Sequence, residues 1–154
     1  MKLLKSFRYA ARGVWCCIKC ETNFRIHLVA ALSVAMFAYV YGVSVTQGAA
    51  LTLIIALIFT AELLNTAIEA VVDLVSPERN TLAALAKDCA AGAVMILAAG
   101  AVIIAVLIFS DTDKLMVCAR FAVEKALYLA IYVAFCAYFI FAVPKQERCK
   151  ADKE

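Results

Sequence analysis

Apolar residues gather along the chain in long stretches separated by short polar segments. Four stretches stand out, at residues 28–45, 49–72, 89–109 and 126–143. A helix needs about 20 residues to cross a bilayer, and backbone polar groups in lipid must be satisfied within the segment. The pattern therefore predicts an all-α integral membrane protein with four transmembrane helices.

Residues 3–20 show a different periodicity. At about 100° per residue, one face collects apolar side chains and the flank collects basic ones. The apolar set is Leu4, Phe7, Ala11, Val14, Trp15 and Ile18, and the basic set is Lys5, Arg8, Arg12 and Lys19. A basic amphipathic helix with a tryptophan is typical of a helix that lies in the membrane interface. The alternative is a soluble helix packed on the protein.

Composition and charge agree with a membrane protein. Hydrophobic residues make up 66% of the 154 residues and charged residues 18%, with a mean hydropathy of +0.93. Soluble domains average about 45–50% apolar and about 25% charged residues. The net charge of +3 is small and scattered, so nucleic acid is not an expected partner.

Lysine and arginine predict the orientation. The segment before residue 28 holds Lys2, Lys5, Arg8, Arg12, Lys19 and Arg25, whereas the connection between the first two spans holds none. Under the positive-inside rule, both termini and the 73–88 loop should be cytoplasmic. The 110–125 loop should lie outside, although it carries three basic residues.

Polar residues interrupt the second span on one side. Glu62, Asn65, Glu69 and Asp73 fall on a stripe about 80° wide. An acid at this depth is costly and is tolerated mainly where it faces a site or a partner. The alternative is a stripe that joins helices by hydrogen bonds.

More polar residues are expected on the same side of the membrane. They are Glu21 and Arg25 before the first span, Glu78, Arg79 and Asn80 in the loop, and Lys87 and Asp88 at the start of the third span. Carboxylates together with phosphate oxygens commonly hold Mg²⁺, and lysine binds phosphate as a point charge. The pattern favours a metal–phosphate site.

Three segments carry a resemblance to a known family. ELLNTAIEAVVD (62–73) and LAKDCAAGAV (85–94) resemble the prokaryotic diacylglycerol kinase and undecaprenol kinase family, and ETNFRIH (21–27) is similar to its Gram-positive undecaprenol kinase branch. The resemblance spans roughly residues 5–108. It implies an integral membrane lipid kinase that moves the γ-phosphate of MgATP to the hydroxyl of undecaprenol or diacylglycerol.

The resemblance also implies roles for individual residues. Glu62 would accept the proton from the lipid alcohol and Asn65 would order the site, while Glu21 and Glu69 would hold Mg²⁺. Nucleotide contacts are expected from Tyr9, Glu21, Glu69, Glu78, Arg79, Asn80, Lys87 and Asp88. Lipid contacts are expected from Glu62, Arg25 and Ala91.

The family is a homotrimer of the bacterial cytoplasmic membrane with three spans, a surface helix and shared active sites. This chain departs from that pattern after the third span. We therefore expect a lipid kinase domain at 1–110 and an extension at 111–154, with an extra fourth span and a basic cytoplasmic tail.

Other interpretations rest on weaker signals. Intramembrane acids also mark ion pathways, but the outer half of the second span offers only Thr52 and Thr60. A structural helper subunit would not need Lys87 and Asp88 beside the acidic stripe. Cys17 and Cys20 form a lone C-x-x-C without the second pair of a zinc site; cysteines near a span could also be palmitoylated. His27 is expected to be an interfacial hydrogen-bonding residue rather than a catalyst.

Overall fold

The computed structural model describes residues 2–78 and 80–142, and this part of the chain is helical with no strand. The helices are α1 (Lys2–Cys20), α2 (Thr22–Tyr41), α3 (Val45–Val75), α4 (Thr81–Ile108), α5 (Thr112–Glu124), α6 (Ala126–Ala137) and a short π-helix, η1 (Tyr138–Ala142). The predicted all-α membrane fold is confirmed. Arg79 and the predicted basic tail lie outside the described residues.

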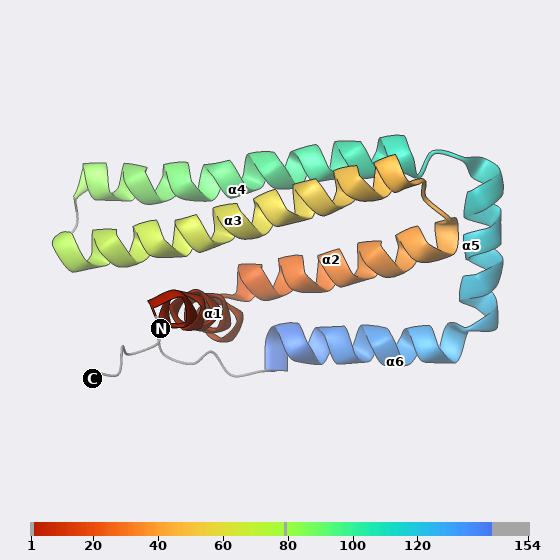
Figure 1. Ribbon diagram of the computed structural model, residues 1–154, viewed down its shortest axis with the longest axis horizontal. Coiled ribbons are helices and arrows are strands. Elements are labelled where there is room, and N and C mark those ends of the chain that lie inside the picture. Colours follow the sequence, from red (N-terminus) through yellow and green to blue (C-terminus); the bar gives the residue numbers. More distant parts are fainter. Residues whose placement is uncertain (1, 79, 143–154) are drawn as a thin grey trace.

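The long helices form a layered bundle, with α1 and α5 crossing it at opposite ends (Figure 1). α3 and α4 pack against each other along their lengths, and α2 lies beside α3. α6 runs back along the far side of α2, so that η1 meets the start of α2. The two ends of the bundle are the α1 end and the α5 end.

Three helices are long and apolar enough to cross a membrane, namely α2 with 20 residues, α3 with 31 and α4 with 28. At about 1.5 Å per residue, α3 is about 46 Å long, which exceeds the hydrocarbon thickness of about 30 Å. The tip where α3 joins α4 extends past α1 in Figure 1. This tip therefore reaches beyond the apolar layer and can meet water.

The helix boundaries differ from the predicted spans because local capping decides them. Gly42 ends α2 in the left-handed conformation, with φ of 70°. Ser44 then starts α3 with a capping box. The Ser44 hydroxyl accepts a hydrogen bond from the Gln47 backbone amide, and Gln47 Oε1 accepts one from the Ser44 backbone amide. Asn80 caps α4 by accepting a hydrogen bond from the Leu82 amide at 2.8 Å. α2 therefore starts and ends earlier than predicted, and α4 starts eight residues before the predicted residue 89.

The predicted 110–125 loop is wrong, because α5 occupies most of it. Asp111 caps this helix through the amides of Asp113 and Lys114. The chain then turns by 86° into the segment Ala126–Ala142, which is the predicted fourth span. With 17 residues, this segment is at the short limit for crossing a bilayer.

Backbone conformation predicts opposite effects for alanine substitutions at Gly42 and Gly13. Gly42→Ala should lower the thermal unfolding midpoint in detergent, because an alanine in the left-handed conformation costs roughly 1–2 kcal/mol. Gly13→Ala, in the interior of α1, should leave the midpoint unchanged or raise it, since a helical alanine is favoured by roughly 0.5–1 kcal/mol. A Cβ at either position would meet nothing within 4 Å, so backbone conformation alone separates them. Equal shifts for both variants would contradict the assigned turn.

Candidate functional site

One face of α3 carries apolar side chains, then carboxylates and other polar side chains, in order along the helix. From the membrane interior toward the tip, the face presents Ile55, Ile58, Phe59, Glu62, Asn65, Thr66, Glu69, Val72, Asp73 and Ser76. These positions recur every three or four residues, as one helix face requires. The first three line an apolar cavity and the last three line a polar one, with the carboxylates between them.

Glu62 is the most deeply buried acid of the stripe, and only 2% of its surface is exposed. His27 on α2 reaches it, with the Nε2 atom 3.2 Å from Glu62 Oε1. The approach is close but lacks hydrogen-bond geometry, so Oε1 has no hydrogen-bond donor among the described residues. A buried carboxylate oxygen with an open lone pair can accept a further proton donor.

Asn65, Glu69 and Glu21 lie around this acid. The Asn65 amide donates to Glu69 Oε1 at 3.0 Å, and the charges of Glu21 and Glu69 both act on the Glu62 carboxyl group. The Asn65 Oδ1 atom is buried and has no hydrogen-bond partner in the described part of the chain. The structure therefore brings together four of the predicted site residues, Glu21, Glu62, Asn65 and Glu69, which form the acidic cluster.

These oxygens fit the chemistry of Mg²⁺. No group of three or more His, Cys, Asp or Glu side chains that could hold a metal occurs within residues 2–78 and 80–142. Mg²⁺ does not need such a cage, because one or two carboxylates together with substrate phosphates usually hold it. Glu21, Glu69 and the open Asn65 Oδ1 supply hard oxygen ligands of the required type.

α1 closes the site from the side. Cys17 is 4% exposed and lies beside Thr66, whose hydroxyl donates to the Glu62 carbonyl at 3.1 Å. Burial raises the pKa of the Cys17 thiol, while the Thr66 hydroxyl lowers it. A protonated, buried thiol behaves as a small apolar side chain, so this cysteine packs α1 against α3.

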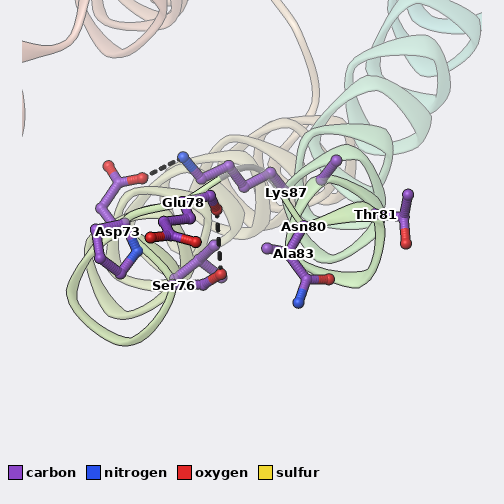
Figure 2. Close-up of a pocket in the computed structure, with 10 residues that line it drawn as sticks. Asp73, Ser76, Glu78, Asn80, Thr81, Ala83 and Lys87 are labelled. Carbon is purple, nitrogen blue, oxygen red and sulfur yellow. Dashed lines mark hydrogen bonds and ion pairs between the residues drawn. The ribbon is translucent and has the colours of Figure 1, made fainter.

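A polar cavity of about 500 Å³ opens at the tip between α3 and α4. Figure 2 shows Lys87 extending to Asp73 across this cavity, where the two side chains form an ion pair. Glu78 and Asn80 also line it. Asn80, however, already uses its Oδ1 to cap α4, so its side-chain NH2 group remains to contact a ligand as a donor.

An apolar cavity of about 320 Å³ lies on the other side of Glu62, between α2, α3 and α4. His27 is its polar lining residue, among apolar side chains that include Ala30, Ala31, Ala98 and Ala101. Small side chains leave room for a flexible chain between the helices. His27 therefore stands between an apolar space and the acidic cluster.

Some predicted residues lie elsewhere. Tyr9 is 66% exposed on α1, and Asp88 and Ala91 are exposed on α4; none of the three lines either cavity. Arg25 is 1% exposed and donates to the Phe139 carbonyl at 3.2 Å. These placements leave the roles predicted for Tyr9, Asp88, Ala91 and Arg25 as predictions.

Sequence reasoning missed the position of His27. The signal that could have located it is the register of the α2–α3 hairpin. The turn at Gly42 and Ser44 joins antiparallel helices. A residue about 16 positions before the turn then faces one about 16 positions after it, which places His27 near residue 60. Identifying the Ser44 capping box would have been enough.

A family model described as prokaryotic diacylglycerol kinase matches residues 8–109. The chain belongs to this family. The match includes α1 to α4 almost entirely and every residue of the acidic cluster, whereas α5, α6 and η1 lie beyond it.

Two relatives support the assignment. The chain is 42% identical over 108 residues to an undecaprenol kinase of Bacillus subtilis (strain 168), and this alignment covers 70% of this chain and 88% of that protein. It is 46% identical over 103 residues to a diacylglycerol kinase of Synechocystis sp. (strain ATCC 27184 / PCC 6803 / Kazusa), and this alignment covers 66% of this chain and 59% of that protein. No solved structure gives a significant match.

Proposed function

We propose that the chain is an ATP- and Mg²⁺-dependent membrane lipid kinase that phosphorylates a lipid alcohol. The observation that carries the proposal is the buried Glu62, which stands between an apolar and a polar cavity in a chain of the prokaryotic diacylglycerol kinase family. The hydroxyl oxygen attacks the γ-phosphorus, Glu62 takes the hydroxyl proton, and ADP leaves. The products are the lipid phosphate and ADP.

The layout of α3 supports this assignment of substrates. The lipid chain fits the cavity beside His27, and its hydroxyl then lies at Glu62. The nucleotide fits the cavity at the tip, where Lys87 supplies a positive charge and water has access. Asp73 and Phe59 are 14 residues apart, or about 21 Å along the axis, so the phosphates have to extend from the tip toward the acidic cluster.

Glu21 and Glu69 would hold Mg²⁺, with Asn65 completing the oxygen set. The ion would neutralise charge on the transferred phosphoryl group, which is what phosphoryl transfer chiefly requires. Lys87 is held by Asp73 in this structure, and phosphate would compete with Asp73 for the lysine. Glu78 and the Asn80 amide then contact the nucleotide from the loop.

The lipid alcohol is undecaprenol or diacylglycerol, and the two relatives carry one name each. Both alcohols present a hydroxyl at the interface, so the apolar cavity has to discriminate between them. The α1 end is then cytoplasmic, because ATP is, and both termini lie on that side of a bacterial cytoplasmic membrane. A homotrimer with shared sites would bring further groups to Tyr9, Asp88 and Ala91.

Purified protein in mixed micelles should phosphorylate a membrane alcohol without a soluble partner. Undecaprenol and diacylglycerol are offered separately with γ-labelled ATP and Mg²⁺, and labelled lipid is counted. The arm that gives label identifies the lipid. Folded wild-type protein that labels neither alcohol would show that the proposed activity is wrong.

Glu62→Gln and Glu69→Gln should fail in different ways. The first keeps the shape of the side chain and removes the base, so kcat should fall by roughly 10²–10⁴ with nucleotide binding nearly unchanged. The second removes a proposed Mg²⁺ ligand, so nucleotide binding should weaken and recover in part at high Mg²⁺. Nucleotide binding and turnover are measured against Mg²⁺ for both variants. The reverse pattern would exchange the two roles.

His27→Leu should lower kcat, because Glu62 loses the polar side chain that lies 3.2 Å from its carboxylate. We expect a loss of about tenfold, which corresponds to about 1.4 kcal/mol. His27→Gln places an amide nitrogen near the Nε2 position and should restore part of the rate. Val34→Ala, which lines the same cavity, serves as the packing control. Equal losses in all three variants would reduce His27 to a packing role.

A further inference from the structure

The segment beyond the family match is tied to α2 by polar contacts at three heights. At the α5 end, the Asp111 amide donates to the Tyr41 hydroxyl at 2.9 Å. Midway, Ser33 and Tyr132 share a hydrogen bond of 2.9 Å. At the α1 end, Arg25 donates to the Phe139 carbonyl at 3.2 Å. The contacted residues of α2 are eight apart, so the contacts recur about every 12 Å.

The contact at Arg25 differs from the other two because it involves a buried charge. Arg25 is 1% exposed, and no other large side chain in the described part of the chain is buried so completely. A guanidinium offers five N–H donors and keeps its charge. Burying that charge costs several kcal/mol unless acceptors face it. Its partners therefore determine where the side chain can lie.

Phe139 provides a suitable acceptor. It lies in η1, at the C-terminal end of the described segment, and a carbonyl oxygen has two lone pairs with which to accept a donor. The C-terminal end of a helix also carries partial negative charge, which favours a nearby cation. A carbonyl at this end therefore fits a guanidinium better than one from the middle of α6 would.

Arg25 also stands at a sensitive place in α2. Its amide donates to the Glu21 carbonyl at 3.3 Å, and His27, which meets Glu62, follows two residues later. A shift of the Arg25 side chain would therefore disturb the start of α2, between Glu21 and His27. The polar cavity at the α3–α4 tip has no lining residue on α2, α5, α6 or η1.

We propose that the segment 111–142 is a brace: its η1 end holds Arg25 through the Phe139 carbonyl and so positions the lipid side of the site. Arg25 is a positioning residue in this proposal, which rests on the proposed kinase function for its kinetic test alone. The expected signature is a weaker use of lipid with unchanged use of nucleotide.

Two truncations in the same helix test the brace. A chain that ends at Ala137 lacks η1 and therefore the Phe139 carbonyl, whereas a chain that ends at Ala142 keeps η1. The first truncation should raise the lipid KM or lower the lipid kcat/KM by about tenfold, the worth of a charged hydrogen bond. The second should resemble wild type, and the KM for ATP should change in neither.

Combining the truncations with Arg25→Met separates a specific contact from general packing. If the brace acts through Arg25, Arg25→Met alone should show the same lipid defect, and truncation after Ala137 should add little to it. Equal effects of the two truncations would overturn the proposal. Full additivity of the truncation after Ala137 with Arg25→Met would also overturn it.

A labelling experiment tests the contact without relying on activity or on the truncations. Cys136 lies on α6 one turn before Phe139 and is partly exposed. In a chain that keeps only this cysteine, Arg25→Met should speed the reaction of Cys136 with N-ethylmaleimide in micelles, because the end of α6 is released. Arg12→Met, on exposed α1, should leave the rate unchanged. An unchanged rate in Arg25→Met would show that Arg25 does not hold the segment. An inactive wild type with the predicted labelling would overturn the kinase function and keep the brace.

Discussion

A carboxylate buried inside a membrane-crossing helix is the constraint on which the rest of the structure depends. Glu62 is 2% exposed, and an acid at this depth is tolerated only when polar groups face it. His27 reaches this acid from α2, and α1 closes the side with Cys17, while Glu21 and Glu69 lie close enough for their charges to act on it. α1, α2 and α3 must therefore converge on one point, which fixes the α1 end of the bundle.

The length of α3 lets one helix connect Glu62 both to the apolar layer and to water. A helix of 31 residues exceeds the apolar layer by several turns. One continuous face therefore passes from the lipid interior, through the buried acid, into water at the tip. A reaction between a lipid alcohol and a water-soluble nucleotide needs such a passage, because neither substrate enters the phase of the other. The side chains on this face change from apolar to acidic to ion-paired in the same order.

The features that depend on one helix could be predicted from the sequence, and those that depend on two could not. The stripe of Glu62, Asn65 and Glu69 follows from a period of 3.6 residues, and the spans follow from length. The contact of His27 with Glu62 and the pairing of Lys87 with Asp73 require the register between helices. That register is decided by short capping signals at Ser44 and Asn80, which a hydropathy pattern overlooks. α5 was missed for a similar reason, since its start is a single capping aspartate in a polar segment.

The added C-terminal segment shows how a helix can find its place in a membrane. Lipid is as apolar as a leucine side chain, so apolar burial gives an added helix little preference for one position over another. α6 has no buried residue, in agreement with this principle. Its position must come from directional contacts, and Tyr41, Ser33 and Arg25 offer them at regular intervals along α2. Contacts spaced in this way fix the height and rotation of the added segment together, because a shift of one residue would turn the Tyr132 side chain away from Ser33 by about 100°. The outer side of α2 therefore selects one register for the segment, and that register brings the end of η1 to Arg25 beside the acidic cluster.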